Sequence, residues 1–574
     1  MSNWKNMYNK WNEAEGLDVE LQQELLTLSE SEKEDAFYCN LEFGTAGMRG
    51  IIGVGTNRMN VYTIRKANTG FAKYISQNGE DACKRGIVIA YDSRHKSPEF
   101  AQESAKVMAS YGIKTYLFED ICSTPELSFA VRELNAFAGI VITASHNPPN
   151  YNGYKIYDET GCQCIPEVAS KIVKLVNAVE NELAITVDSL ENYLKQGLIE
   201  LIGEKIDAAY NEAVCATSFA DVPKTEIKLV YTSLHGTGHI PVLRALQTLR
   251  YKNVFPVDAQ CTPDPNFTTV PLPNPEDPNV FALAKQVAKQ VDADILLATD
   301  PDADRLGIAV KADNGEYQLL NGNITGGLMT YYILEQLKDM DKLPANGVLF
   351  TTIVTSDFAE KIAASFNITT ERTLTGFKFI GDRIKHYEST KEKQFLFGFE
   401  ESYGSLTNAT IARDKDAVQA CVILVEMAAF YKKQGRTLLD VLAELSTKFG
   451  TFEEGLVNIS LAGITGAKKI KKLITTISNS PFTTMNGQEV VTFENYITST
   501  RITANEETKI TLPKADVLKF YLADGSWFCV RPSGTEPKAK IYIAVCEKAK
   551  PIAEAKVEAL KNAIMVEINK IIAD

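Results

Sequence analysis

Three aspartates occur at alternate positions in the segment TDPDADR, directly after the apolar run ILLA. The run predicts a buried strand, so Asp300, Asp302 and Asp304 come at a strand end, on one side of a tight loop. Oxygen-only ligands favour a hard cation, Mg²⁺ or Ca²⁺. An EF-hand needs glycine and glutamate where this chain has Arg305 and Lys311. The segment therefore predicts a divalent-metal loop, and the alternative is a solvated acidic turn with Arg305 as a surface counter-charge.

The segment TASHNPPNYNGYK presents Ser145, His146 and Lys155. Adjacent prolines prevent helix formation, and we expect neither helix nor strand anywhere in this stretch, only a fixed loop. The serine does not lie in a GxSxG nucleophile elbow, and no Asp–His pair accompanies it. A serine near a metal and a phosphate grip suits phosphoryl transfer, which needs positioning and charge neutralisation. The alternative is that Ser145 caps a turn and His146 packs in a loop.

The segment RPSGTEPK predicts an anion-binding turn. Arg531 offers a planar fork of donors, Ser533 and Thr535 offer hydroxyls, and Gly534 lets main-chain N–H groups approach closely. Lys538 adds a further positive charge. An ordinary hairpin turn is the alternative, because Pro-Ser-Gly-Thr is common turn composition.

Two further loops carry polar groups. In GFEESYG, a buried strand ends with Glu400, Glu401 and Ser402, which suit the hydroxyl groups of a neutral polyol. The glycine-rich segment FGTAGMRG carries Arg49, which on its own is a weak signal. No Walker A sequence occurs in the chain.

Three of these loops follow copies of one strand–helix pattern. Apolar runs alternate with helical stretches as β-α-β-α-β three times, and the last strands deliver Ser145, Asp300 and Glu400. Ligands of open α/β sheets lie beyond the carboxyl ends of the strands, so a shared cleft is expected. The tail holds two strands around RPSGTEPK and an amphipathic helix. We predict an α/β protein with three similar βαβαβ mixed-sheet domains and a C-terminal α+β domain. The expected domains are 1–208, 209–322, 323–435 and 436–574.

Composition excludes some classes of partner. The formal net charge is −13 over 574 residues, which argues against broad binding of nucleic acid or membrane surfaces. Ten scattered cysteines without a CxxC pair indicate reduced thiols. The amino terminus does not resemble a signal peptide, and the longest apolar stretch, AVQACVILVEMAAFY, predicts a buried helix. We expect a cytoplasmic protein that binds small molecules; its oligomeric state, monomer or homodimer, is not predicted.

Taken together, FGTAGMRG, TASHNPPNYNGYK, DPDADR, GFEESYG and RPSGTEPK resemble the α-D-phosphohexomutase superfamily, over nearly the whole chain and in the same order. The resemblance implies a four-domain, heart-shaped molecule with a central active site. It implies interconversion of glucose 1-phosphate and glucose 6-phosphate through a phosphoserine enzyme and glucose 1,6-bisphosphate, which also primes the enzyme. Mg²⁺ is the implied cofactor. The pair Glu-Glu at 400–401 points to the glucose branch, since mannose-type and glucosamine-type members carry Met or Gln at the second position.

The resemblance also assigns roles. It makes Ser145 the phosphoryl carrier and a metal ligand together with Asp300, Asp302 and Asp304. It places catalytic contacts at His146, Lys155 and Arg49, and leaves open which of these is the general acid or base. The implied substrate-binding residues are Arg305, Thr375, Lys378, Glu400, Ser402, Lys415, Arg531, Ser533, Gly534 and Thr535.

Other functions stay open from the sequence. GTAGMRG and LHGTGH also resemble the branch that contains phosphopentomutases, so ribose or deoxyribose 1-phosphate can be the substrate. A phosphomannomutase is a further alternative. ILLATDPDAD resembles the start of aspartyl-phosphate phosphatases, although Ala303 differs from their usual residue. A third hypothesis is a non-catalytic sugar-phosphate-binding protein. A metal site at His235 and His239 is disfavoured, because a Gly-Thr-Gly loop separates them.

Overall fold

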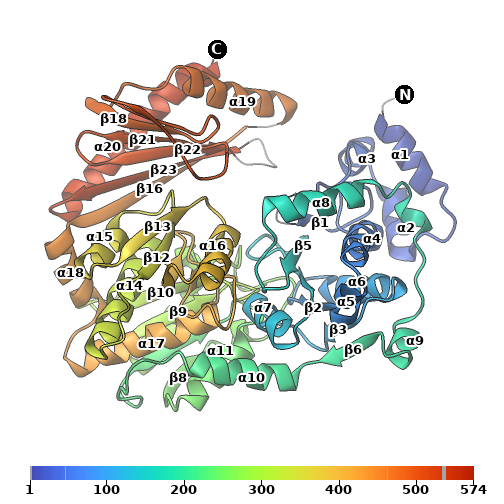
Figure 1. The fold of residues 1–574 in the computed structure, drawn as a ribbon, viewed down its shortest axis with the longest axis horizontal. Helices are drawn as coiled ribbons and strands as arrows, with labels where there is room; N and C mark the ends of the chain where they lie inside the picture. The colour runs from blue at the N-terminus through green and yellow to red at the C-terminus, as the bar shows by residue number, and fades with distance from the viewer. Residues whose placement is uncertain (1–2, 45–46, 462, 533–537, 574) are drawn as a thin grey trace. The chain divides into compact units, whose positions relative to one another are not determined.

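The computed structural model describes residues 3–44, 47–461, 463–532 and 538–573. The chain divides into two compact units. Figure 1 labels their helices and strands. Unit 1 consists of Met1–Leu349 and Phe377–Thr437, and unit 2 consists of Phe350–Gly376 and Leu438–Asp574. The predicted Ser145, the three aspartates and Glu400 all belong to unit 1.

The first sheet of unit 1 is mixed. Its strands lie in the order β1 (Met48–Ile51), β5 (Tyr151–Asp158), β4 (Ala138–Ile142), β2 (Ile87–Tyr91), β3 (Thr115–Phe118) and β6 (Ile199–Ile202). β4, β2, β3 and β6 run parallel, whereas β5 runs antiparallel to β4 and β1. β2 and β4 are buried along their length, as their continuous apolar runs predict, whereas β6 at the sheet edge exposes two of its four residues.

Helices cover both faces of this sheet. On one face, α4 (Val61–Gln77) packs against α6 (Ser97–Ser110) and α8 (Pro166–Asn177), over Ile87 and Ile89 of β2. On the other face, α7 (Thr124–Glu133) packs on β2 and β4. Shorter elements complete this part: α5 (Glu80–Arg85), η1 (Glu182–Ala184) and α9 (Leu190–Lys195). The sheet is thus fixed from both sides, and β4 ends at the predicted Ser145 loop.

The expectation that the whole segment 143–155 is a loop is wrong from Tyr151 onward. β5 begins at Tyr151, and Lys155 pairs with Val141 of β4 in an antiparallel register. The two prolines restrict only themselves and the preceding Asn147. After them the chain can return along β4, because residues such as Tyr154 favour a pleated, buried strand. Lys155 is therefore held by a strand.

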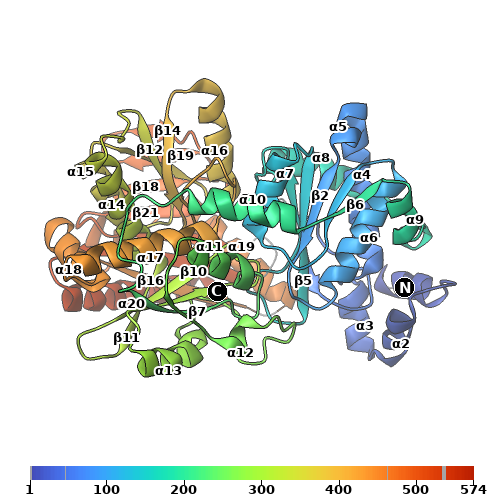
Figure 2. The ribbon, with the colours of Figure 1, turned by 90° about the horizontal axis from the view of Figure 1, so that it is seen from below.

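The second sheet also contains antiparallel strands. Its order is β11 (Tyr317–Leu320), β10 (Leu306–Lys311), β9 (Ile295–Thr299), β7 (Lys228–Thr232) and β8 (Asn253–Pro256). β10 returns antiparallel to β9, with Leu306 opposite Thr299, so the aspartate loop is the turn of a hairpin. Its helical elements are α11 (His239–Thr248), α12 (Asp258–Cys261), η2 (Pro278–Phe281) and α13 (Ala282–Val291). α10 (Glu204–Cys215) contacts α7, α11 and α17 (Figure 2).

The third repeat contributes elements to both units. Unit 1 contains α14 (Gly322–Asp339), α16 (Phe377–Thr390) and the antiparallel pair β14 (Gln394–Phe399) and β15 (Ser405–Leu406). The boundary passes through β12 (Gly347–Thr352), and unit 2 receives α15 (Phe358–Ser365) and β13 (Thr369–Thr373). The apolar stretch after residue 416 forms α17 (Ala417–Lys433), which is buried as predicted.

Three helices that the sequence did not predict precede the first sheet. They are α1 (Asn3–Asn12), α2 (Val19–Thr27) and α3 (Glu30–Phe37). Trp11 is fully buried against Phe37 and Tyr62, and its indole N–H donates to Glu182 Oε1 at 3.1 Å. The small cluster around Trp11 fastens these helices to the first sheet's helical layer.

Unit 2 contains a large antiparallel sheet. Its strands lie in the order β16 (Thr451–Ser460), β23 (Lys538–Glu547), β22 (Trp527–Pro532), β21 (Leu518–Leu522), β18 (Gln488–Asn495), β19 (Thr500–Thr503) and β20 (Glu507–Lys509). β17 (Thr484–Met485) pairs with β18, and the other helices are α18 (Leu438–Phe449), α19 (Gly463–Asn479) and α20 (Lys550–Ala573). α20 buries Val557, Leu560 and Ile564 over the sheet, which confirms the predicted α+β tail.

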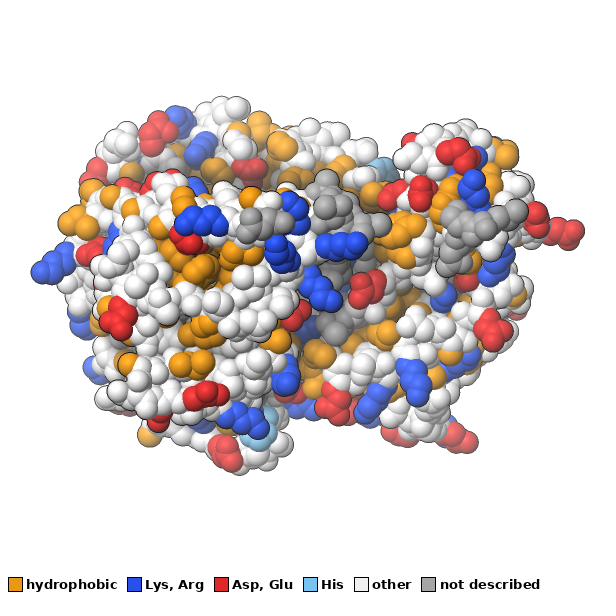
Figure 3. All heavy atoms as spheres, turned by 90° about the horizontal axis from the view of Figure 1, so that it is seen from above, with side chains coloured by type: hydrophobic (Ala, Val, Ile, Leu, Met, Phe, Trp, Pro, Cys, Tyr) orange, Lys and Arg blue, Asp and Glu red, His pale blue; other side chains and the backbone are white. Residues whose placement is uncertain are grey.

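The surface and the helices agree with the composition. Acidic and basic side chains both occur across the face drawn in Figure 3, where much of the surface is uncharged. Among the described residues, none of the helices has the length and apolar character needed to cross a membrane.

The close approach of α14 to β14 generates a stability prediction. A Cβ at Gly326 would lie 2.3 Å from the ring of Phe399. Gly326→Ala gains helix propensity of about 1 kcal/mol, but overpacking costs about 1–3 kcal/mol. With so short a contact we expect the overpacking to dominate and the urea midpoint of the variant to fall. A raised midpoint would contradict the packing of α14 on β14.

Candidate active site

Ser145 lies in the turn that joins β4 to β5. It is 3% exposed and has a left-handed backbone, with φ of 51°. Its main-chain N–H donates to Thr143 Oγ1 at 2.8 Å, and the Thr143 hydroxyl donates to Asp92 Oδ2 at 2.6 Å. These contacts hold the serine in a conformation that a free chain rarely adopts.

Arg94 lies beneath this turn and organises it. The side chain is buried, and its guanidinium donates to four main-chain carbonyl oxygens of the turn. These belong to Ser145 (2.6 Å), Asn147 (2.5 Å), Pro148 (2.7 Å) and Tyr151 (3.1 Å). Five guanidinium donors in a fixed plane suit this task, and a lysine could not reproduce it.

The three aspartates form a compact group. Asp300, Asp302 and Asp304 are at most 2% exposed, and a ligand oxygen from each lies within 4.8 Å of the others. Asp300 Oδ1 accepts from the main-chain N–H groups of Asp304 (3.1 Å) and Arg305 (3.0 Å). Asp302 Oδ1 and Asp304 Oδ1 are buried without a hydrogen-bond partner. Buried oxygens that lack donors fit a metal ion, because coordination would satisfy them.

The serine and aspartate loops meet directly. Ser145 Oγ donates to Asp300 Oδ2 at 2.6 Å, although 155 residues separate the two positions. His146 Nδ1 lies 3.1 Å from Ser145 Oγ. Burial and the nearby positive charges of Arg305 and Arg49 hold the pKa of His146 well below its usual value. The imidazole is therefore uncharged at neutral pH.

Two lysines neutralise the aspartates. Lys155 Nζ lies 2.6 Å from Asp302 Oδ2 and 3.3 Å from Asp304 Oδ2. Lys415 Nζ lies 3.1 Å from Asp304 Oδ2 and 3.1 Å from Asp414 Oδ1. Burial lowers the pKa of Lys155, but the charges of the aspartates outweigh it and the net shift is upward. Burial and the neighbouring carboxylates raise the pKa of Asp300.

The predicted sugar-binding loop lies against the metal loop. Leu306 N–H donates to Tyr403 O at 2.9 Å, and Arg305 forms an antiparallel bridge with Gly404. Glu400 N–H donates to Gly404 O at 2.8 Å and closes the turn. Arg305 Nη1 lies 2.9 Å from Glu276 Oε1. The carboxylate of Glu276, from another loop, therefore orients the side chain of Arg305.

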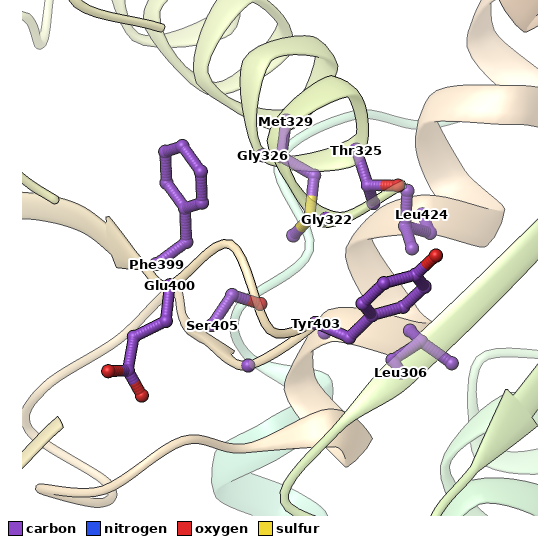
Figure 4. A pocket seen from close by; sticks show the side chains of 12 residues that line it. Leu306, Gly322, Thr325, Gly326, Met329, Phe399, Glu400, Tyr403, Ser405 and Leu424 are labelled. Carbon is purple, nitrogen blue, oxygen red and sulfur yellow. The ribbon is translucent and has the colours of Figure 1, made fainter. Parts of the chain in front are cut away.

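Apolar side chains pack against the predicted sugar-binding loop (Figure 4). Met329, Tyr403 and Leu424 surround a cavity of about 10 Å³, and Glu400 points away from them. A Cβ at Gly322 would lie 2.1 Å from the carbonyl oxygen of Glu401, so only glycine lets α14 begin this close to the loop. Ser402 is half-buried in the turn.

The remaining predicted residues are distributed between the units. Lys378 is buried on α16, and the exposed Arg49 side chain donates to Asn147 Oδ1 at 2.8 Å; both lie in unit 1. Thr375, after β13, and Arg531, on β22, are half-buried in unit 2. Ser533, Gly534 and Thr535 lie outside the described residues.

Sequence reasoning missed Thr124, Arg94 and Asp414. Thr124 is fully buried at the start of α7; its N–H donates to Asp302 O at 2.9 Å and its hydroxyl to Asp302 Oδ2 at 2.7 Å. The segment YDSR at the end of β2 and the capping sequence STPE were the available signals, but neither indicates its long-range partner. His235 is not a metal ligand: its ring nitrogens lie 2.9 Å from Thr262 O and 2.7 Å from Thr269 Oγ1.

Family comparisons identify the fold as a known one. The models of the phosphoglucomutase/phosphomannomutase α/β/α domains I, II and III match residues 40–183, 208–315 and 321–449, and the C-terminal domain model matches 486–561. The chain belongs to the phosphoglucomutase/phosphomannomutase family. It is an enzyme of the α-D-phosphohexomutase superfamily with the four-domain α/β architecture that its sequence predicted.

Full-length relatives support the same family. A phosphoglucomutase of Staphylococcus epidermidis is 38% identical over 97% of this chain and 100% of its own. One from Staphylococcus aureus is 37% identical over 90% of this chain and 92% of its own. Among solved structures, a phosphoglucomutase/phosphomannomutase family protein from Burkholderia thailandensis superimposes with a TM-score of 0.66 at 18% identity, covering 92% of this chain and 97% of that one. Parafusin from Paramecium in its open form gives 0.65 at 18%, covering 93% and 95%. Membership implies a metal cofactor, and the aspartate group fits one.

Thr124 generates a prediction about metal binding. Thr124→Val removes the hydroxyl that orients Asp302 but leaves the α7 cap, which Ser123 supplies. Loss of a partner that orients a ligand lowers metal affinity by about 10-fold or more. We expect that loss in calorimetric titrations with Mg²⁺ and Mn²⁺.

Thr124→Ser is the matched control, because it keeps the hydroxyl. Its metal affinity should stay within about 2-fold of the natural protein's, by the same argument. Equal affinities for the valine and serine variants would rule out the orienting role.

Proposed function

We propose that this protein is a phosphoglucomutase, which interconverts α-D-glucose 1-phosphate and glucose 6-phosphate through a phosphorylated Ser145. The observation that carries the proposal is the 2.6 Å contact between Ser145 Oγ and Asp300 Oδ2. It places the only serine of the TASHNP segment against an acidic group suited to a metal. The phosphoglucomutase relatives support glucose as the sugar.

The cofactor in this proposal is Mg²⁺, held by Asp300, Asp302, Asp304 and an oxygen of phosphorylated Ser145. When bound, it neutralises negative charge on the transferring phosphoryl group. The all-oxygen donor set supports Mg²⁺ over softer metals. Without the metal, Lys155 and Lys415 compensate part of the negative charge of the carboxylates.

The transfer step follows from these positions. The bond between phosphorus and Ser145 Oγ breaks as O6 of glucose 1-phosphate bonds to phosphorus. The O6 proton passes to a base, and Ser145 Oγ takes up a proton to become a hydroxyl again. We propose Lys155 as the general acid or base at the sugar oxygen, with His146 and Arg49 as the alternatives. Because the aspartates raise the pKa of Lys155, its ammonium is suited to donate a proton to O6 in the reverse step, and it accepts the O6 proton only after losing its own. The product, glucose 1,6-bisphosphate, reorients in the site so that its other phosphoryl group faces Ser145 and is transferred back to it. The same bisphosphate primes unphosphorylated enzyme.

The remaining proposed roles concern binding. Glu400 and Ser402 hold the sugar hydroxyls, and Arg305, Thr375, Lys378 and Lys415 hold other substrate groups. Arg531, Ser533, Gly534 and Thr535 bind the phosphate that does not react. We propose domain boundaries near residues 208, 322 and 435. We also propose a cytoplasmic location, which the ten cysteines support because none of them forms a disulfide in the described part of the chain.

Phosphoryl labelling tests the carrier. Incubation with glucose 1,6-bisphosphate labelled in its phosphoryl groups should give acid-stable phosphate on Ser145, and Ser145→Ala should lose both the label and turnover in a coupled assay with Mg²⁺. Acid-labile label on Asp300 would instead support the aspartyl-phosphatase hypothesis. Folded, phosphorylated protein without turnover would support the non-catalytic one.

A substrate comparison tests the sugar. We expect kcat/KM for glucose 1-phosphate to exceed the values for mannose 1-phosphate and deoxyribose 1-phosphate by about 10-fold or more, the discrimination that one well-placed polar contact supplies. A higher value for deoxyribose 1-phosphate would make the protein a phosphopentomutase.

A further inference from the structure

A broad groove lies in unit 2, and none of the predicted active-site residues belongs to its lining. Its volume is about 760 Å³, within the range of small-molecule sites. α15, β13, β21 and the β19–β20 hairpin supply its walls. All of its lining residues belong to unit 2 and to the described part of the chain.

Positive charge exceeds negative charge on this lining. Its acidic residues are already paired: Arg372 forms ion pairs with Asp357 and Glu360. Arg501 Nε lies 3.7 Å from Glu494 Oε1. The charged residues of the lining that take part in none of these ion pairs are all lysines.

Three lysines of the lining have no carboxylate within 4.0 Å among the described residues. These are Lys361, Lys509 and Lys519. The exposed Lys361 donates to Phe449 O at 3.3 Å and Cys546 Sγ at 3.4 Å, outside the lining, so it must rotate to reach an anion in the groove. Lys509 is exposed on β20. An anion in the groove would supply the missing negative charge.

Lys519 is the informative member, because it is 0% exposed in the floor of the groove. Its ammonium donates to Ile353 O at 2.7 Å and lies 3.9 Å from the ring centroid of Trp527 and 4.7 Å from that of Tyr521. Burial, with the charge of Arg372, lowers the pKa of Lys519 to about 8. Burying an ammonium without a carboxylate partner costs desolvation free energy, and dissolved salt screens the charge of a buried group only weakly. The aromatic rings offset part of that cost.

We propose that this groove binds a small molecule that carries a diphosphate group, with Lys361 and Lys509 contacting the anion and Lys519 attracting it from the floor. The lining carries five basic and three acidic residues, a net charge of +2, and a diphosphate group carries at least two negative charges. The groove is larger than a diphosphate alone requires, and the half-buried Tyr521, Ile510 and Leu512 on its lining leave an amphipathic surface for an organic part. This site is separate from the proposed phosphoglucomutase activity and does not depend on it.

Calorimetric titration with inorganic pyrophosphate in EDTA tests the site. The titrated protein is Arg531→Ala, so that the proposed catalytic phosphate loop is weakened, while EDTA removes divalent metal. We expect saturable binding of this variant within about 2-fold of the natural protein. Adding Lys519→Met, or Lys361→Ala with Lys509→Ala, should weaken it at least about 5-fold, since each removes charge. The double substitution of Lys361 and Lys509 changes only exposed side chains, so it provides the test if Lys519→Met does not fold.

Lys514→Ala is the control, because Lys514 is an exposed lysine of the same segment outside the lining. It should leave pyrophosphate binding unchanged. Binding lost in Arg531→Ala alone, or kept in both lysine variants, would overturn the proposal. ADP should bind at least as tightly as pyrophosphate; binding more than about 10-fold weaker would exclude the organic part.

Discussion

The site depends on one constraint, which is that three buried carboxylates, those of Asp300, Asp302 and Asp304, lie close together. Ser145 Oγ lies 2.6 Å from Asp300 Oδ2, and the other carboxylates lie around it. Buried carboxylates are tolerated only when cations or donors compensate them. Lys155 and Lys415 supply two charges, and two carboxylate oxygens keep no donor. A site built this way is ready for a divalent metal and for a phosphoryl group.

Main-chain contacts hold that charge in position. The aspartate loop receives or gives hydrogen bonds to three segments that come from different parts of the chain. These bonds are Thr124 N to Asp302 O (2.9 Å), Leu306 N to Tyr403 O (2.9 Å) and Ala417 N to Ala303 O (3.1 Å). Because the backbone makes them, they hold the metal loop against α7, the sugar-binding loop and α17 whatever the side chains are. The serine loop meets the metal loop through side chains, with Ser145 Oγ against Asp300. The arrangement explains why loops of three repeats serve one site.

Unit 2 treats buried charge in the opposite way. The aspartates of unit 1 are paired with lysines, whereas Lys519 lies over aromatic rings and donates to one carbonyl oxygen. Aromatic rings stabilise a cation less than a carboxylate does, but they leave its field unneutralised. One chain therefore contains a site that attracts cations and a groove that attracts anions, with a net charge of −13 that indicates neither.

The sequence by itself determined which residues can do chemistry and which segments are buried. Ser145, the three aspartates, α17 and the α+β tail were all predicted, because residue type, short spacing and apolar runs are local properties. Only the tertiary structure decided that Lys155 lies on β5, and that Arg94 and Thr124 hold the two loops. These roles depend on partners many residues away, and no local pattern encodes the register of a strand or the far end of a hydrogen bond. The helices α1–α3 were missed for a related reason: their few apolar residues, such as Trp11, become a core only against Tyr62 of a later helix.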